Sequence, residues 1–492
     1  MSALASLRFD NRFVQQLPAD TDTRNLPRQV TGAAWSAVTP KRAPAPQLVS
    51  YSPEVAELLG LSAEDCTSET FVEAFVGNQL LPGMEPYAMC YGGHQFGHWA
   101  GQLGDGRAIN LGEVVNDRGE HLTLQLKGAG PTPYSRRADG LAVLRSSVRE
   151  YLCSEAMHHL GVPTTRALSL ILTGEQVTRD MFYDGNPELE PGAVVCRVAP
   201  SFMRFGSFEI FAAREDHTLL RQLLDFTLKA DFPELLPESG EPVAATYVAW
   251  LAEVARRTAE LMAHWMRVGF VHGVMNTDNL SVLGQTIDYG PYGWLEGYDP
   301  GWTPNTTDAQ GKRYSYGAQP NIALWNLVRL ANAIYPLVGE AKPLEEALGI
   351  YSETYGQCRA RDMAAKLGFS QFIEADGPLV EDLLALLQMT ETDMTIFFRA
   401  LSDIDLTAAA EASDETLITP LLAAYYQPPD NKIIAATGQW LRRYIARSQQ
   451  NLAEPGESNS TRRTRMHSVS PKYVLRNYLA QQAIDKAEAG DF

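Results

Sequence analysis

The chain has 492 residues, 45% hydrophobic and 20% charged, which is typical of a globular protein with enough chain for two or three domains' worth of core. Acidic residues outnumber basic ones 59 to 41, and the formal net charge of −18 argues against a general nucleic-acid or anionic-membrane surface. The five cysteines form no C-x-x-C pair, which argues against a zinc site or a disulfide framework. Because neither a signal peptide nor a membrane-length apolar run is found, we expect a cytoplasmic monomer that binds neither nucleic acid nor membranes.

Residues 1–80 are rich in proline and alanine around Thr39–Pro46, with a short helical pattern from Pro53 to Leu61. Proline interrupts regular hydrogen bonding, so this part is expected to be largely extended. We interpret it as an N-terminal extension that packs on the body of the protein and carries no chemistry.

The first chemical signal is the segment Tyr91–Arg107, with glycines at 92, 93, 97, 101, 104 and 106. Glycine lets the backbone approach a polyphosphate closely and point its N–H groups at the anion, and Arg107 would add a charge-assisted contact. The spacing fits neither of the familiar phosphate-binding glycine motifs, and a series of tight turns explains the glycines equally well. For His94 and His98 we favour packing or hydrogen-bonding roles over metal binding, since a regular helix is doubtful here.

A strand lysine follows. Asn116–Gly119 is predicted to be the hairpin turn between strands at 109–115 and 122–127. Leucines alternate with polar residues over Leu122–Lys127, so Lys127 lies on the face opposite the leucines. Lysines placed like this reach for phosphates in the V-A-I-K strand of kinases, although a surface lysine on an edge strand is the commoner case.

A helix is predicted from about Leu141 to Leu160, and it contains Glu150 and Glu155. If it corresponds to the kinase helix αC, one of the two glutamates pairs with Lys127 and positions it. We choose Glu150, although the spacing barely separates the two.

Two arginines follow in apolar surroundings. Arg197 lies inside the strand pattern Val194–Val198, and Arg204 lies in the segment Ser201–Gly206. Together with Lys127 and Arg107, they would gather positive charge around a triphosphate within an otherwise acidic chain.

An amphipathic helix over residues 249–268 leads into a segment that resembles the kinase loop H-R-D-x-x-x-x-N and the later D-F-G. His272 and Asn279 keep the seven-residue offset, and Asp288-Tyr289-Gly290 stands for D-F-G. The amide and carboxylate oxygens of Asn279 and Asp288 suit a hard cation such as Mg²⁺. As single residues both are commonly turn formers, but the whole arrangement favours a metal site.

The usual catalytic base is missing from this loop. Its position, two residues after His272, is occupied by Val274, which cannot accept a proton. The nearest replacement is Asp278, beside Asn279 on the same loop. The pattern therefore indicates a kinase-like metal site with altered chemistry.

From Asn321 to about Tyr444 the pattern is helical. Residues 453–466 are predicted to be an exposed loop, and Pro471–Ile484 a last helix that docks back on the body.

The parts follow one another in the order found in a bilobal kinase: glycine loop, strand lysine, helix glutamate, metal loop and metal aspartate. The predicted fold class is α+β, a bilobal protein-kinase-like fold with an N-terminal extension and a largely helical C-terminal region. We divide the chain into the extension (1–80), a kinase-like N-lobe (81–200), a C-lobe core with the metal and catalytic loops (201–320) and the helical C-terminal region (321–492).

Long stretches of the chain resemble the selenoprotein O (SelO, YdiU) family. The resemblance covers nearly the whole length and rests on Tyr91–Arg107, Leu126–Arg137, His272–Asn279, Ile287–Pro291 and Pro471–Ile484. It implies a pseudokinase-type fold that transfers AMP from ATP to Ser, Thr or Tyr hydroxyls of proteins, with Mg²⁺ or Mn²⁺, and releases pyrophosphate. It also implies that the nucleotide is flipped relative to kinases, with the α-phosphorus facing the acceptor.

The resemblance assigns a role to each matching position. For the nucleotide, it implies contacts with Gly104, Gly106 and Arg107, and contacts of the nucleoside with Asp139 and Gly140. For the phosphates, it implies binding by Lys127, which Glu150 positions, and contacts with Arg197 and Arg204. It further implies that Asp278 accepts the proton and that Asn279 and Asp288 hold the metal, Asp288 also being part of the ATP site. One departure concerns regulation. Some members pair a C-terminal cysteine or selenocysteine with a cysteine after D-Y-G-P, but Tyr292 follows Pro291 here and the chain ends without a cysteine, so that redox pair cannot operate.

Two other classes of function remain open from the sequence. It does not show which phosphorus faces the acceptor, so a phosphotransferase acting on a protein or a small molecule is an alternative. The missing loop base would also permit a non-catalytic nucleotide-binding scaffold. Retention of Lys127, Asn279 and Asp288 argues against the scaffold, because a scaffold does not require a complete metal site.

Overall fold

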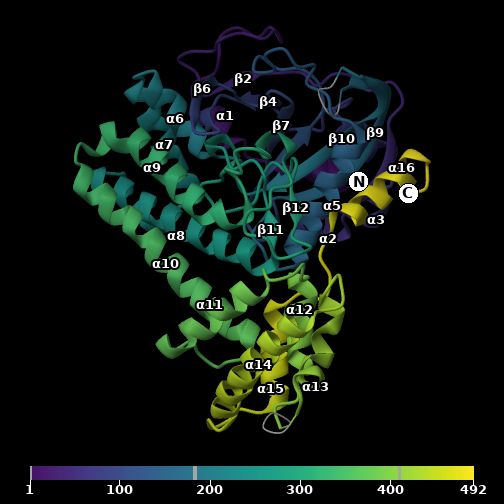
Figure 1. Ribbon diagram of the computed structural model, residues 1–492. Helices are drawn as coiled ribbons and strands as arrows, with labels where there is room; N and C mark the ends of the chain where they lie inside the picture. The colour runs from purple at the N-terminus through teal and green to yellow at the C-terminus, as the bar shows by residue number, and fades with distance from the viewer. Residues whose placement is uncertain (1–2, 181–184, 408–411) are drawn as a thin grey trace.

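The computed structural model describes residues 3–180, 185–407 and 412–492. It is a mixed α+β structure in which a strongly twisted sheet occupies the upper part of the molecule and helices form the middle and lower parts (Figure 1). The sheet has eight strands in the order β2-β4-β7-β8-β10-β9-β3, with β1 paired to β7, and its pairs are antiparallel. The strands are β1 (Arg8–Phe9), β2 (Trp35–Ala37), β3 (Gln47–Tyr51), β4 (Tyr87–Met89), β7 (Ala108–Val115), β8 (His121–Lys127), β9 (Arg166–Arg179) and β10 (Glu188–Ala199), and the two-stranded pieces are β5 (Gly92–Gln95) with β6 (His98–Gln102) and β11 (Phe270–Val271) with β12 (Gly293–Trp294).

The central hairpin β7–β8 forms where the sequence predicts it. The side chain of Asn116 accepts backbone N–H groups of Arg118 and Glu120, and Gly119 takes the positive φ that the turn requires. The leucines of β8 are fully or almost fully buried against the core, as alternation predicts. The opposite face of β8 carries Gln125 and Lys127, which are also buried, and therefore face a polar interior rather than solvent.

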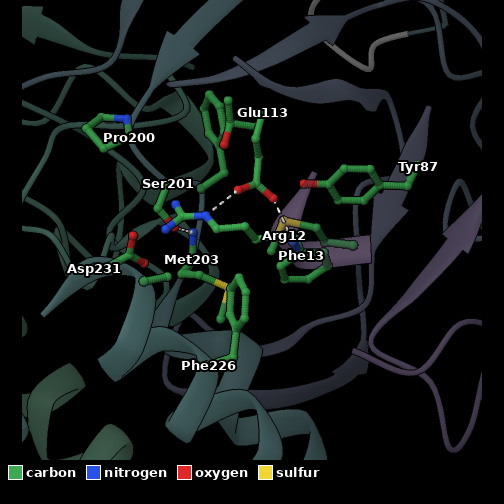
Figure 2. Close-up of a pocket in the computed structure, with 13 residues that line it drawn as sticks. Arg12, Phe13, Tyr87, Glu113, Pro200, Ser201, Met203, Phe226 and Asp231 are labelled. Carbon is green, nitrogen blue, oxygen red and sulfur yellow. Dashed lines mark hydrogen bonds and ion pairs between the residues drawn. The ribbon is translucent and has the colours of Figure 1, made fainter. Parts of the chain in front are cut away.

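The N-terminal extension is built into the sheet. Its strands β2 and β3 form the two ends of the strand order, and β1 adds to β7. Glu113 on β7 holds the short helix α1 (Arg12–Gln16) by accepting from the Phe13 N–H at 2.7 Å and from Arg12 Nε at 3.3 Å (Figure 2). The small pocket in Figure 2 is also lined by Asp231. It lies where the N-terminal extension, the sheet and the helices meet.

The helical part is organised around α8, which begins at Ala244, five residues before the predicted start, and ends at Val268 before Gly269 in a left-handed conformation. The apolar stripe of α8 is buried, and the helix packs against α9 and α10. The helices are α1 (Arg12–Gln16), α2 (Pro53–Leu58), α3 (Ala63–Cys66), α4 (Glu69–Val76), α5 (Leu144–His159), α6 (Phe205–Ala213), α7 (His217–Asp231), α8 (Ala244–Val268), α9 (Gln319–Val338), α10 (Ala341–Leu367), α11 (Gly377–Leu386), α12 (Met394–Ala400), α13 (Asp414–Ile418), α14 (Asn431–Leu452), α15 (Asn459–Val469) and α16 (Asn477–Glu488).

The expected loop at 453–466 is wrong for its second half, because α15 begins at Asn459. Ser458 caps this helix by accepting the N–H of Thr461. Arg462 is 1% exposed, and its guanidinium donates to the Leu401 carbonyl and the Tyr444 hydroxyl. The sequence predicts that the segment 453–466 is exposed, but contacts with residues elsewhere in the chain bury Arg462.

The last helix, α16, begins at Asn477 rather than at Pro471. It returns from the lower helices to lie beside α5, so the C-terminus ends near the sheet (Figure 1). Ile484 and Ala487 enter the same small core as Leu144 and Val148 of α5. Docking of this helix on the body is therefore confirmed.

Within the three described ranges, each helix is too short or too polar to cross a lipid bilayer.

Candidate active site

The site is built where the polar face of β8 meets α5. Lys127 Nζ forms an ion pair with Glu150, and both side chains are almost completely buried. Burial lowers the pKa of Lys127 to about 8, while the Glu150 charge opposes this change. Glu155, the other candidate, instead binds Arg166 Nε at 2.7 Å. The expected pairing of Lys127 with Glu150 is therefore present.

Arg197 joins this pair to the metal aspartate predicted from the sequence. It lies on β10, next to β8, and is 2% exposed. Its Nη1 is 3.1 Å from Glu150 Oε1 and 2.6 Å from Asp288 Oδ1, and its Nη2 donates to Gln125. A guanidinium presents donors in a fixed planar fork, so Arg197 sets the spacing between the two carboxylates.

Arg204 reaches Asp288 from the other side. It lies just before α6, donates to Asp288 Oδ2, and donates to the backbone carbonyl of Asp278 at 2.7 Å. Burial alone would raise the pKa of Asp288, but Arg204, Arg197 and Lys127 hold it well below its usual range. Asp288 is therefore an ionised carboxylate with both oxygens engaged.

The backbone of Asp288 has φ 56°, in the left-handed region that Asp tolerates better than most residues. His272 supports this conformation, because its Nε2 donates to the carbonyl of Ile287 at 2.9 Å. The buried imidazole also stacks on Trp265, 5.4 Å away. His272 thus ties the loop that precedes the metal residues to the segment that carries Asp288.

Asp278 and Asn279 lie together in the 3-10 turn Thr277–Asn279. Burial raises the pKa of Asp278 to about 7. Its Oδ2 accepts from Gln95 Nε2 at 3.2 Å, while its buried Oδ1 has no donor among the residues that the structure describes. Asn279 donates its Nδ2 to the Val274 carbonyl at 2.9 Å, which orients the side-chain amide.

The first half of the glycine segment forms the hairpin β5–β6 and packs directly on the Asp278 loop. The N–H of His94 donates to Thr277 Oγ1 at 2.7 Å, and a Cβ at Gly93 would lie 2.6 Å from Asp278 Oδ1. His94 Nδ1 lies 2.6 Å from Glu209, so the expected hydrogen-bonding role of this histidine is confirmed. At least one of these glycines is therefore required by close packing against a functional loop.

The second half of the glycine segment packs on the loop that follows Lys127. A Cβ at Gly104 would clash with the ring of Tyr134, and one at Gly106 would lie 2.9 Å from the Tyr134 carbonyl. Thr132 Oγ1 donates to the Asp105 carbonyl at 2.7 Å, and Ser135 donates to the Gly106 carbonyl. The two segments that the resemblance assigns to the nucleotide therefore lie side by side.

The remaining predicted residues lie at the edge of this arrangement. Arg107 is exposed, and its charge contributes to the lowered pKa of Lys127. Asp139 is exposed and pairs with Arg179 Nη1 at 2.8 Å, whereas Gly140 is buried against the backbone of Gly130. Neither Asp139 nor Gly140 bonds to the Lys127–Asp288 cluster in the described part of the chain.

The donor set fits a hard divalent cation. Asp288 carries an ionised carboxylate whose oxygens retain lone pairs beside the arginines, and Asn279 has its amide nitrogen engaged, so that its oxygen is left as the ligand atom. The buried Oδ1 of Asp278 is a further oxygen without a donor. Oxygen ligands of this kind suit Mg²⁺ or Mn²⁺ and not a soft metal.

Three polar residues of the site are not identified by the sequence patterns. Gln125 lies two residues before Lys127 on the same strand face, and this alternation is a usable signal. Asp105 is 1% exposed and accepts hydrogen bonds from the Met89 N–H and Asn110 Nδ2. Its position between two glycines is a weaker sequence signal than the alternation that marks Gln125. Gln95 is brought to Asp278 only by the fold, and no local pattern separates it from its neighbours.

Comparison with known proteins gives the class of protein. Relatives from Aromatoleum aromaticum and Rhodopirellula baltica, both named protein nucleotidyltransferase YdiU, are 58% and 59% identical to this chain, over 99% of its length and 92% and 91% of theirs. A relative of the same name from an Azoarcus species is 58% identical over 99% of this chain and 91% of its own. The protein is therefore a nucleotidyltransferase.

A family model described as "Protein adenylyltransferase SelO" matches residues 24–492. The chain belongs to the SelO family. The resemblance that rests on the glycine segment, the strand lysine and the two metal-loop motifs is thus confirmed.

Proposed function

We propose that the protein has a bilobal, kinase-like architecture and transfers AMP from ATP to Ser, Thr or Tyr hydroxyls of other proteins. The observation that carries this proposal is the buried network Lys127–Glu150–Arg197–Asp288–Arg204, whose Arg204 also donates to the backbone of the loop that carries Asp278. It combines the lysine–glutamate pair and metal aspartate of a kinase with a displaced base. Names of the relatives and the family model support nucleotidyl transfer rather than phosphoryl transfer.

The cationic groups would bind the triphosphate. Lys127, Arg197 and Arg204 converge on one small region, and their partners Glu150 and Asp288 keep them in place. Gly104, Gly106 and Arg107 would contact the phosphates from the adjoining turn, and Asp139 and Gly140 the nucleoside. Charge that develops on the pyrophosphate leaving group would be stabilised by side chains positioned before the reaction.

Asp278 would accept the proton of the attacking hydroxyl. Its buried, donor-free Oδ1 and its pKa of about 7 suit a general base. The hydroxyl oxygen forms the new bond to the α-phosphorus as the bond to the pyrophosphate oxygen breaks, and the proton goes to Asp278. A Mg²⁺ or Mn²⁺ ion held by Asn279 and Asp288 would supply neutralisation of phosphate charge when bound.

The direct test uses ATP labelled at either the α- or the γ-phosphate. The purified protein and a bacterial lysate are incubated with Mg²⁺, and the modified proteins are analysed by mass spectrometry. We expect α-label and the mass of one AMP on hydroxyl side chains, and slower transfer with retained ATP binding in the variant Asp278→Ala. Transfer of the γ-label would instead establish a kinase, and binding without transfer would establish a scaffold.

A further inference from the structure

Lys366 is a second buried lysine, in the helical part of the molecule. It lies away from the buried network that joins Lys127 to Asp288. Lys366 is in the last turn of α10 and is 4% exposed. It lines a pocket of about 100 Å³ between α8, α10, α11 and α12, four helices that are labelled in Figure 1. None of the pocket's lining residues belongs to the Lys127–Asp288 cluster.

The ammonium group of Lys366 has no hydrogen-bond acceptor and no carboxylate partner among the residues that the structure describes. Its one contact of note is with the ring of Phe398, whose centroid lies 4.2 Å from Nζ. Burying an ammonium without an acceptor is costly, and native proteins normally pair such groups. Asp362 attracts Lys366 from within the same helix but forms no ion pair with it in the described part of the chain, so the ammonium lacks a directly bonded anion.

Other charges around the pocket are mainly positive. Arg267 of α8 donates to the carbonyls of Val469 and Leu160, and the charge of Asp362 compensates it only in part, because burial still lowers the pKa of Arg267. Arg359 of α10 also lines the pocket, and its charge opposes the rise in the pKa of Tyr298 that burial causes. One carboxylate, Asp362, also lines the pocket: its Oδ1 binds the neighbouring Arg361 at 3.1 Å, its buried Oδ2 has no donor among the described residues, and its charge raises the pKa of Lys366 and of Arg267. In a chain of net charge −18, a pocket with this balance selects anions.

The walls of the pocket are apolar or aromatic. They include Tyr298, Tyr316, Tyr355, Met266, Met363 and Phe398. Tyr316 uses its hydroxyl to donate to the Met266 carbonyl at 2.6 Å, so its ring serves as wall. A small cavity with one buried cation and aromatic walls suits a monoanion with a compact apolar body better than a phosphate, which needs several donors.

We propose that this pocket binds a small organic carboxylate, whose carboxylate group pairs with Lys366 while its apolar body packs against the tyrosine and methionine side chains. The carboxylate oxygens would then accept hydrogen bonds from the Lys366 ammonium. The site is additional to the nucleotide site and does not depend on the proposed AMP transfer.

Binding should depend on pH through Lys366. Burial, and to a smaller extent the charge of Arg267, lower the pKa of Lys366 to about 7, while the charge of Asp362 opposes them. The lining residues from α11 and α12 are the apolar Leu384, Met394 and Phe398, which bring no competing charge. The lysine would therefore be cationic below about pH 7 and neutral above it.

The test is calorimetric titration of the full chain with benzoate at about pH 6 and about pH 8.5, with uncharged benzyl alcohol as the matched probe. We expect benzoate to bind at least about tenfold more tightly at the lower pH, as the protonated fraction of a group with this pKa requires. Benzyl alcohol should bind weakly at both pH values. Absence of benzoate binding to the wild-type protein at millimolar concentration overturns the proposal.

Two variants identify the group responsible. Lys366→Met removes the charge at nearly constant volume and should abolish the pH-dependent binding, whereas unchanged binding would place benzoate elsewhere. Arg359→Met is the second variant, because this exposed residue tolerates replacement if Lys366→Met fails to fold. It should weaken benzoate binding several-fold at about pH 6, and no change there would also count against the site.

Discussion

Lys127 and Lys366 are both buried, and burial lowers the pKa of both, to about 8 and about 7. Their surroundings differ in one respect: Lys127 meets Glu150 within a network of five charged side chains, whereas Lys366 meets aromatic and apolar groups. The first lysine is held at a defined position by its carboxylate. The second forms no ion pair with any residue that the structure describes, and its charge state is free to respond to pH or to a bound anion. The comparison of these two lysines teaches that burial alone does not decide the role of a lysine. The groups around its ammonium decide it.

The largest effect should follow from removing the carboxylate that both arginines bind. Asp288→Ala deletes a proposed metal ligand and leaves Arg197 and Arg204 without their common partner. We expect AMP transfer to fall by about 10³-fold or more, to background, in the labelled-ATP assay. Asp382→Asn is the matched control, since that carboxylate is exposed and forms a surface pair with Arg443. Full activity with Mg²⁺ in Asp288→Ala would refute the metal assignment.

Glu150→Gln removes the carboxylate that pairs with Lys127, so that Lys127 becomes a buried lysine without its partner. Removing one member of a buried ion pair leaves an uncompensated charge, and we expect the free energy of unfolding in urea to fall by about 3 kcal/mol. Glu155→Gln breaks the more exposed pair with Arg166 and should cost about 1 kcal/mol. Adding Lys127→Met to Glu150→Gln should restore part of the loss. Equal effects of the two glutamate variants would show that Lys127 and Glu150 are not coupled.

Lys366→Met is the converse test, because it removes an unpartnered charge. Without added carboxylate, we expect the variant to be more stable than the wild type by about 1–2 kcal/mol at pH 6. The folded-state pKa is lowered, so the unfolded chain binds the extra proton between about pH 7 and the ordinary lysine value of 10.5. Wild-type stability should therefore rise relative to the variant as the pH rises through this window. A difference that is constant with pH would mean that Lys366 titrates normally.

The smallest effect should come from an ion pair at the surface. Asp139 and Arg179 form a short pair, but the aspartate side chain is 44% exposed. Arg179→Gln should change the free energy of unfolding by less than about 1 kcal/mol, measured in urea. A larger loss of unfolding free energy would show that the loop from Gly128 to Gly140 depends on this pair. It would also contradict the expectation that exposed ion pairs stabilise this protein less than buried ones.

Much of the site could be predicted because its signals are local. The offset from His272 to Asn279, the D-Y-G tripeptide and the alternation that ends at Lys127 are each readable within a few residues. The loop expected at 453–466 failed because the burial of Arg462 depends on Leu401 and Tyr444, 61 and 18 residues away. Gln95 escaped for the same reason, since it meets Asp278 across 183 positions.

The sequence by itself determined the family and most of the strands and helices that carry the candidate site, because periodicity and motif spacing are properties of neighbouring residues. Only the tertiary structure decided that Glu150 rather than Glu155 pairs with Lys127, and that Arg197 and Arg204 both hold Asp288. It also decided that Lys366 is buried against Phe398, with no ion-pair partner within the described ranges. Charges interact strongly only within a few ångströms, and distances between residues far apart in the chain exist only once the chain has folded.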